Sequence, residues 1–196
     1  MTSKSKNELM ATGKVTSLSI NGKPSRWYVT FTLDGPYTDS HSGLVRKLSD
    51  HDGVYTKTSH MKKGAKVFNW RSWTALSLEE IEEIESSLKL KIPQGCLLEN
   101  IVISGIPNFS KLKPTTRLVF QSNDNFLKDN RAVLAVWEEN GPCGTVGKRL
   151  EEHHKKPGLK TDFIAAAQNK RGLMGIVLYA GIIAIGDSVL VYPPVE

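Results

Sequence analysis

Residues 171–192 read RGLMGIVLYAGIIAIGDSVLVY, and this stretch decides the fold class most clearly. Residues 175–180 and 188–192 are short runs rich in β-branched and aromatic residues, bounded by glycine or proline, which is typical of strands. The apolar run 174–185 contains further glycines and is too short to cross a bilayer. We therefore expect two short strands here and no transmembrane helix.

Further strand-like runs occupy much of the remaining chain. They cover residues 11–20, 26–33, 66–76, 97–104, 116–120 and 131–137. Helices are expected at 146–154, at 161–170 and after Ser77, where Ser77 would accept from the Glu80 amide and Glu80 would reach back, as in a capping box. Because alternating strand and helix units are missing, the pattern predicts a mainly β fold, a closed or partly open β-barrel with a few short peripheral helices. Without repeats or linkers, we expect a single domain over residues 1–196.

The composition is that of a globular chain, since 39% of its 196 residues are hydrophobic and 23% are charged. The net charge of +6 and the pI of about 9.3 favour an anionic partner, such as a phosphorylated ligand, an anionic cofactor or nucleic acid. The basic residues are spread out, which disfavours a nucleic-acid tail. The polar N-terminus lacks the apolar core of a secretory signal, so a cytoplasmic location and two reduced cysteines, Cys96 and Cys143, are expected.

Cys143 is the sharpest candidate for chemistry. It stands in Gly141-Pro142-Cys143-Gly144, where proline lacks an amide hydrogen and glycine lets a ligand approach the sulfur closely. If 146–154 is a helix, its positive N-terminal end and the basic residues Lys148 and Arg149 favour a thiolate. Such a thiolate can be a nucleophile, a sulfur carrier or a ligand for a soft metal. The alternative is a small buried residue in a turn.

Other candidates carry weaker signals. Glu99 and Asn100 interrupt an apolar strand, where buried polar side chains must find partners or bind something; the alternative is a strand edge. Arg171 stands where a helix gives way to a strand and could hold phosphate, or could be an ordinary cation at a helix C-terminus. Cys96 is expected to pack as a small hydrophobe.

Missing motifs disfavour several function classes. The sequence has no Walker loop, no G-x-G-x-x-G and no G-x-S-x-G, which weighs against nucleotide-dependent enzymes and α/β hydrolases. His153 and His154 suggest zinc, but C-x-x-C and H-E-x-x-H are absent, so a helix surface is the better interpretation. The polar segment 37–64 has little periodicity and is expected to be an irregular excursion, a kind of segment that often carries function.

Several of these places, taken in order, resemble the MOSC domain, named for the C-terminal domain of molybdenum cofactor sulfurases. Residues 98–105, LENIVISG, are similar to the family's Gly-Glu-Asn strand, with Leu98 in place of the glycine, and Gly141-Pro142-Cys143 is similar to its Pro-Cys motif. Residues 171–177 and 181–189 look like its arginine, strand and closing Gly-Asp turn. Order and spacing agree over residues 66–194.

The resemblance implies a barrel of the pyruvate-kinase-barrel type and a stand-alone, bacterial-type member of the family. It also implies that Cys143 either carries persulfide sulfur or coordinates molybdenum in the pterin cofactor. In members that bind the cofactor, polar and basic residues hold the pterin and its phosphate, and Asn100 and Arg171 match those positions. Glu99 adjoins Asn100 and belongs to the same implied set.

Three further residues extend this implied cofactor site. Lys148 and Arg149 follow the cysteine motif and would add positive charge for the anionic pterin. His41 lies in a fragment similar to a His-Gly-Gly motif, in which Ser42 replaces the first glycine.

The sequence thus leaves three hypotheses. In the first, a molybdenum-cofactor-binding protein uses Cys143 as a molybdenum ligand and reduces N-hydroxylated compounds by two electrons. In the second, Cys143 is a persulfide carrier that delivers sulfur to a metal-sulfur centre without bound molybdenum. The third is a non-enzymatic basic barrel that binds nucleic acid, which the scattered basic residues disfavour. The chain is too short for the pyridoxal-phosphate domain of full sulfurases, so we expect a separate sulfur donor such as a cysteine desulfurase, or an electron-donor protein, and no membrane partner.

Overall fold

The computed structural model describes residues 8–49, 52, 57, 60–122 and 131–194. The strands are β1 (Ala11–Ile20), β2 (Lys23–Ser25), β3 (Tyr28–Thr32), β4 (Gly35–Pro36), β5 (Val45–Lys47), β6 (Lys66–Phe68), β7 (Trp73–Ser77), β8 (Ile101–Ser104), β9 (Arg117–Gln121), β10 (Val133–Glu139), β11 (Leu173–Tyr179), β12 (Gly181–Ala184) and β13 (Ser188–Tyr192). The helices are α2 (Leu78–Leu88), the 3-10 helix η2 (Phe109–Lys111), α3 (Gly144–His154) and α4 (Leu159–Ala166).

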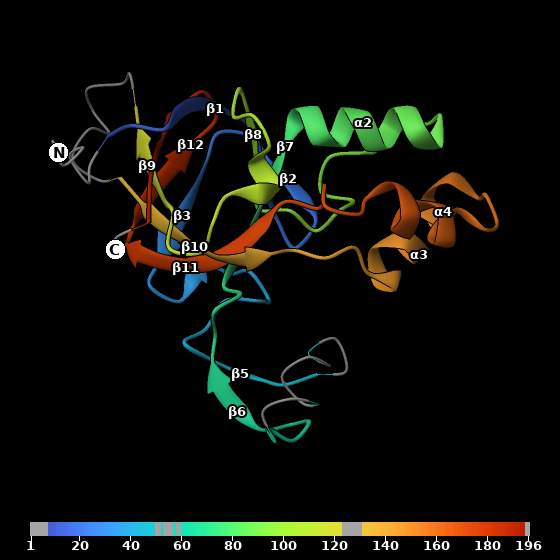
Figure 1. Ribbon diagram of the computed structural model, residues 1–196, viewed down its shortest axis with the longest axis horizontal. Helices are drawn as coiled ribbons and strands as arrows, with labels where there is room; N and C mark the ends of the chain where they lie inside the picture. The colour runs from blue at the N-terminus through green and yellow to red at the C-terminus, as the bar shows by residue number, and fades with distance from the viewer. Residues whose placement is uncertain (1–7, 50–51, 53–56, 58–59, 123–130, 195–196) are drawn as a thin grey trace, which may run out of the picture.

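Seven of these strands form a closed barrel. Their order is β13, β9, β10, β11, β7, β8 and β1, and pairing of β1 with β13 closes the sheet. Among the described strands, β7 and β8 are the one parallel pair, because α2 crosses over from the end of β7 before the chain enters β8. Helices α2, α3 and α4 gather on one side of the barrel, and the β5–β6 hairpin projects away from it (Figure 1). The expected β-barrel with peripheral helices is confirmed.

Two apolar clusters stabilise this arrangement. The larger fills the barrel and includes the fully buried Trp73 and Phe120. The smaller lies beneath the helices and includes Leu97 and Cys96, which therefore packs as a small hydrophobe as predicted. Cys143 is partly buried against this second cluster. The candidate cysteine thus lies where the helical layer meets the barrel.

The strand expected at 97–104 begins only at Ile101. Leu98 has a φ of 58°, a left-handed conformation that does not fit an extended strand. Glu99 and Asn100 therefore precede β8 in a loop, and the prediction that they interrupt a strand is wrong. Leu98 occupies the place of the glycine in the resembled motif, and glycine adopts this conformation without the steric cost.

The helix expected at 161–170 is α4, but both of its predicted ends are wrong. It begins at Leu159, after an N-cap at Gly158 whose φ of 87° turns the chain sharply into the helix. Leu159 is fully buried in the second cluster, so packing decides where the helix starts. The helix ends at Ala166.

The predicted capping box at α2 is half correct. Ser77 Oγ accepts from the Glu80 N–H at 3.3 Å, as expected. The Glu80 carboxylate does not reach back, because it is buried and accepts from the Ser110 N–H at 3.0 Å and the Ser110 hydroxyl at 2.6 Å. The contact between Glu80 and Ser110 therefore replaces the expected bond from the Glu80 carboxylate back to the Ser77 N–H.

The expected irregular excursion over 37–64 contains a short strand. Residues 45–47 pair with 66–68 as the antiparallel β5–β6 hairpin. A second small sheet joins β12, β3 and β4. None of the helices in the described ranges is long and apolar enough to cross a membrane.

Candidate functional site

Cys143 lies in the connection between β10 and α3 and is the N-cap residue of that helix. Its backbone is extended, with φ −128° and ψ 154°, and its side chain makes no capping hydrogen bond. Cys143 therefore stands at the end of α3 where the N–H groups of the first turn form the positive end of the helix dipole. The expected helix after Cys143 is confirmed, and it starts at Gly144.

Arg171 is a cation buried beside this cysteine, only 3% exposed. Its Nη2 donates to the carbonyl oxygen of Leu97, but its Nε and Nη1 have no hydrogen-bond partner in the described part of the protein. Burial lowers the pKa of Arg171, and the charges of Glu99 and Cys143 act in the opposite direction. Burying two unused donors is costly unless the guanidinium binds a further group.

Glu99 is a buried carboxyl group whose charge also acts on Arg171. One of its oxygens accepts from the N–H of Gly95, and the other is buried without a partner among the described residues. Burial raises the pKa of Glu99, against the effects of nearby N–H groups and of Arg171. We call Cys143, Arg171 and Glu99 the sulfur site.

Gly172 fixes the position of Arg171 relative to the barrel. Its φ is 77°, and a Cβ atom there would lie 2.0 Å from the carbonyl oxygen of Ala75 in β7. Only glycine lets the chain pass β7 this closely. The Gly172 N–H donates to Ser110 Oγ at 2.8 Å, and Ser110 is in turn held by Glu80 of α2. Strand β7, helix α2 and the start of β11 are therefore tied together at the sulfur site.

Asn100 follows Glu99 in sequence, but its side chain contacts a different set of residues. Its Oδ1 accepts from the Thr74 N–H at 2.9 Å, and its Nδ2 donates to Asp39 at 3.0 Å. The Nδ1 of His41, an exposed residue, lies 3.2 Å from the other oxygen of Asp39. Burial acts to raise the pKa of Asp39, but hydrogen bonds from His41 and from backbone N–H groups lower it to about 2. Asn100 and His41 thus meet around Asp39, and their role in cofactor binding stays a prediction.

The two basic residues after Cys143 lie in different places. Lys148 is exposed, and its Nζ lies 3.7 Å from Glu152, one turn further along α3. Arg149 Nε donates to the carbonyl oxygen of Cys96 at 3.3 Å. Burial raises the pKa of the Cys96 thiol, although the Arg149 charge partly offsets this effect. Cofactor binding by Lys148 and Arg149 also stays a prediction.

The sequence did not single out two residues that contribute here, Asp39 and Lys160. Lys160 crosses the first turn of α3, since a Cβ atom on Gly144 would lie 2.9 Å from its Cε and 3.5 Å from its Nζ. Its ammonium group adds positive charge beside Cys143. The sequence signal that could have indicated a close neighbour here is the pair Gly144 and Gly147, because these small residues let Lys160 of α4 approach α3 closely.

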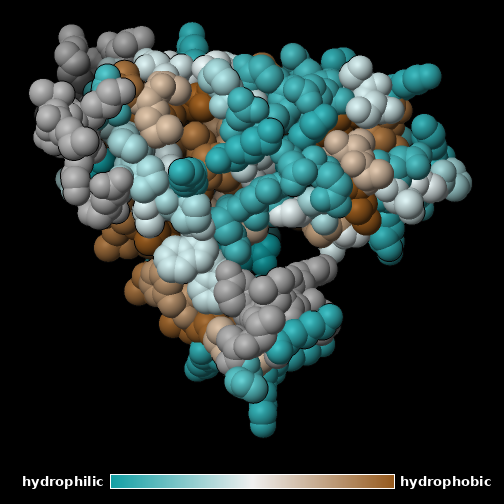
Figure 2. Space-filling view, viewed as in Figure 1, coloured by the Kyte–Doolittle hydropathy of each residue, from teal (hydrophilic) through white to brown (hydrophobic). Residues whose placement is uncertain are grey.

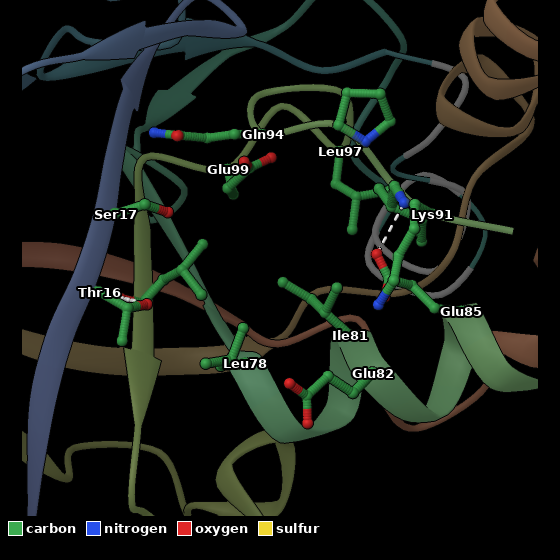
Figure 3. A pocket seen from close by; sticks show the side chains of 13 residues that line it. Thr16, Ser17, Leu78, Ile81, Glu82, Glu85, Lys91, Gln94, Leu97 and Glu99 are labelled. Carbon is green, nitrogen blue, oxygen red and sulfur yellow. Dashed lines mark hydrogen bonds and ion pairs between the residues drawn. The ribbon is translucent and has the colours of Figure 1, made fainter.

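A pocket of about 300 Å³ opens between β1 and α2 on the side of Glu99 (Figure 3). Its walls are mainly apolar and include Ile81 and Leu97, and the Lys91–Glu85 ion pair lies on one side. Of the residues that the structure describes, neither Cys143 nor Arg171 lines this pocket. Glu99 is therefore the residue that the pocket and the sulfur site share.

No cluster of three or more His, Cys, Asp or Glu side chains within the described ranges could hold a metal ion. The rings of His153 and His154 contact each other edge to face, with centroids 4.8 Å apart. The zinc interpretation thus finds no support in this part of the chain. Cys143 is a single soft ligand, and any metal there would need other ligands from a cofactor.

The strands of the barrel follow one another in the order of a known family, with Cys143 and Arg171 inside the matched range. The family model described as the MOSC domain matches residues 67–190. This chain belongs to the MOSC domain family. The resemblance seen in the sequence is confirmed, and the roles of Cys143 and Arg171 in the family's site stay predictions.

One relative, the YuaD protein of Bacillus subtilis, resembles this MOSC chain in both sequence and structure. The protein named "Putative metal-sulfur cluster biosynthesis proteins YuaD" from Bacillus subtilis (strain 168) is 29% identical over 166 residues, which cover 83% of this chain and 78% of the relative. The crystal structure of the YuaD protein from Bacillus subtilis matches with a TM-score of 0.82 at 26% identity, covering 95% of this chain and 98% of that one. YiiM from Escherichia coli shares the fold alone, with a TM-score of 0.55 at 14% identity over 93% of this chain and 71% of that one.

Proposed function

We propose that this MOSC protein is a sulfur carrier, in which Cys143 accepts a sulfur atom as a persulfide and passes it toward a metal-sulfur centre. One observation carries the proposal: the half-buried sulfur lies at the N-terminus of α3, beside the buried Arg171 guanidinium with its two unpartnered N–H donors. The name of the Bacillus relative, which refers to metal-sulfur cluster biosynthesis, supports the same assignment.

The loading step needs only the sulfur of Cys143 and a donor persulfide. The Cys143 thiolate attacks the outer sulfur of the donor persulfide and forms a new S–S bond. The S–S bond of the donor breaks, and its electron pair leaves with the donor thiolate. The transfer is therefore redox-neutral. Release of the carried sulfur as sulfide would consume two electrons, which a thiol reductant at the acceptor can supply.

Each group of the sulfur site has a role in this step. The N–H groups at the start of α3 stabilise negative charge on the Cys143 sulfur. The unpartnered N–H groups of Arg171 would bind the charged outer sulfur of the persulfide. The apolar cluster against which Cys143 packs would keep water and other thiols away from the S–S bond.

Mass spectrometry tests this proposal directly. After incubation with a cysteine desulfurase and cysteine, the wild-type protein should gain one sulfur atom on Cys143. The Cys143→Ser variant should gain none, and Cys96→Ser, the matched control, should load like the wild type because Cys96 is buried away from the donor. A wild-type protein that gains no sulfur would rule out the carrier role.

A second candidate is binding of the molybdenum-pterin cofactor, which the MOSC family implies. The residues fit part of this group: Cys143 is a soft thiolate ligand for molybdenum, and the spare donors of Arg171 suit an anionic group of the pterin. The side-chain amide of Asn100 already makes hydrogen bonds to Thr74 and Asp39, so it would act by holding these two residues in place. When bound, the cofactor would supply two-electron chemistry toward N-hydroxylated compounds.

Metal analysis separates the two candidates. Protein purified from a host that makes the cofactor should contain molybdenum and give fluorescent oxidised pterin if the second candidate holds. Cys143→Ser should then lose the metal, whereas Lys113→Ser should retain it because Lys113 is exposed and belongs to no predicted site. Absence of both molybdenum and pterin from the wild-type protein would count against cofactor binding and leave the carrier role unaffected.

A further inference from the structure

Strands β5 and β6 pair as a hairpin that projects from the barrel, and we call these two strands together with Leu44 the arm (Figure 1). Strand pairing places Val45 opposite Phe68 and Lys47 opposite Lys66. Alternate residues of a strand face the same side, so these four side chains share one face, which we call the outer face of the arm.

The outer face is exposed and combines apolar and basic groups. Val45 is 59% exposed and Phe68 is 52% exposed, and the neighbouring Leu44 is also exposed. Lys47 and Lys66 are exposed beside them. Figure 2 shows apolar surface where the arm joins the barrel and polar surface at its tip. An apolar centre with a charged rim is the arrangement of a protein-binding surface.

The opposite face fixes the arm to the barrel. Arg46 makes two hydrogen bonds to Asp52 at 2.8 and 2.9 Å, and Arg71 approaches the same carboxylate at 3.3 Å. The guanidinium of Arg46 lies 4.5 Å from the ring centroid of Trp70, which stacks on Trp137 of β10 at 6.2 Å. The arm is therefore a positioned surface, which lowers the entropic cost of binding a partner.

Much of the net charge of the chain comes from the stretch of sequence that begins just before β5 and ends with β6. Residues 44–68 contain six Lys and Arg against two Asp, a net charge of +4 out of +6 for the whole chain. Helix α2, by contrast, carries five glutamates at 79, 80, 82, 83 and 85. The two surfaces differ in sign, so an acidic partner is attracted to the arm and repelled by α2. The basic residues are scattered in sequence, and strand pairing brings Lys47 and Lys66 together.

The arm attaches close to Cys143. Trp70 contacts β10 through Trp137 and through Glu138, whose carboxylate lies 3.2 Å from the indole nitrogen. Strand β10 ends at Glu139, and four residues of extended chain span at most about 14 Å. A folded domain is about 30 Å across. One bound protein can therefore cover the outer face of the arm and still reach Cys143.

We propose that the outer face of the arm docks a sulfur-donor protein through an acidic surface and brings its persulfide to Cys143. The proposal rests on the carrier role proposed above. The transferred atom is the outer sulfur of the donor persulfide, and the donor thiolate leaves with the electron pair of the broken S–S bond. Phe68 is the one exposed aromatic side chain among the described arm residues, whereas nucleic-acid strands bind on several stacked aromatic rings, so the surface favours a protein.

The test compares sulfur transfer from a persulfide-loaded cysteine desulfurase of the same organism with loading by free cysteine persulfide. The variant Lys47→Glu with Lys66→Glu keeps like charges opposite each other, so the hairpin itself is not further destabilised. At low salt its transfer rate from the desulfurase should fall about tenfold or more, and the difference should shrink at high salt. Loading by free cysteine persulfide should stay at the wild-type rate.

Matched controls complete the experiment. Lys14→Glu with Lys113→Glu makes the same charge change at exposed barrel lysines and should leave transfer unchanged. Phe68→Ser should slow transfer from the desulfurase without changing its salt dependence. If the arm variants accept sulfur from the desulfurase at the wild-type rate, or lose binding to poly(U) instead, the docking proposal is overturned. If the wild-type protein loads from free persulfide and not from the desulfurase, docking fails while the carrier role stands; if neither source loads Cys143, the carrier role fails.

Discussion

The variant Arg171→Met distinguishes a binding arginine from a structural one. Methionine keeps an unbranched apolar side chain but removes the guanidinium. The loss of the hydrogen bond to Leu97 leaves a buried carbonyl oxygen unpaired, at a cost of about 1–3 kcal/mol. The change also removes two buried N–H groups that lack protein partners, each of which costs a similar amount in the wild type. These effects offset each other, so the free energy of unfolding should change by no more than about 2 kcal/mol.

The matched control is Arg131→Met. Arg131 is also buried and also has two unpartnered guanidinium nitrogens, but its Nη1 donates to the buried Asp187 carboxylate at 2.7 Å. Removing it leaves that carboxylate without its cation, so the free energy of unfolding should fall by about 3–5 kcal/mol. Urea unfolding followed by tryptophan fluorescence measures both variants.

The Arg171→Met protein should also lose reactivity at Cys143. Loading of Cys143 from a donor persulfide should become about tenfold slower, because the change removes the N–H donors that would bind the charged outer sulfur, and a hydrogen bond to a charged group contributes about 1.5 kcal/mol or more. The reasoning is refuted if Arg171→Met destabilises the protein as strongly as Arg131→Met does and Cys143 reacts at the wild-type rate. Arg171 would then be a structural residue.

Three further predictions follow from the same geometry. Gly172→Ala should lower the free energy of unfolding by about 3 kcal/mol or more, because its Cβ would lie 2.0 Å from a carbonyl oxygen, whereas Gly158→Ala, with a similar φ and open space, should cost about 1 kcal/mol in thermal melts. Asp39 has a pKa of about 2, below its ordinary 3.8, so its ionised carboxylate stabilises the folded state at neutral pH, and this stabilisation is lost as the pH falls toward 2. Asp39→Asn should therefore lower the free energy of unfolding by about 1–2 kcal/mol at pH 7 and by almost nothing at pH 2, measured by urea unfolding at both pH values. Iodoacetamide should label Cys143 in the native protein and Cys96 only after unfolding, since Cys96 is 8% exposed and burial raises its pKa; mass spectrometry with equal labelling of both would contradict this.

The parts of the fold that could be predicted from sequence depend on local patterns. The strands expected at 175–180 and 188–192 follow from β-branched runs between turn residues, and the helix expected at 146–154 is α3, which starts two residues earlier at Gly144. Strand β5 has three residues, which is too short for alternation to be detected, so 37–64 was expected to be irregular, whereas β6 lies within the strand-like run expected at 66–76. Short strands of this kind form because of their pairing partner.

The contacts that define the site could not be predicted, because they join residues far apart in the chain. Asn100 and Asp39 are 61 residues apart in sequence, and Arg171 donates to a carbonyl 74 residues away. Glu80 was expected to cap its own helix but binds Ser110, since tertiary contacts override local propensity. The sequence identifies groups with suitable chemistry, and only the fold shows which of them meet.

The sulfur site contains one cation for two groups that can each be negative. Arg171 interacts with both Glu99 and the Cys143 sulfur, and burial raises the pKa of Glu99. The raised pKa of Glu99 favours a neutral carboxyl group beside the guanidinium. The charge of Arg171 and its two unpartnered N–H groups would then be available to the outer sulfur of a persulfide on Cys143. This arrangement gives a physical reason for a cation and a carboxyl group, each with unused hydrogen-bonding atoms, to be buried together behind one sulfur.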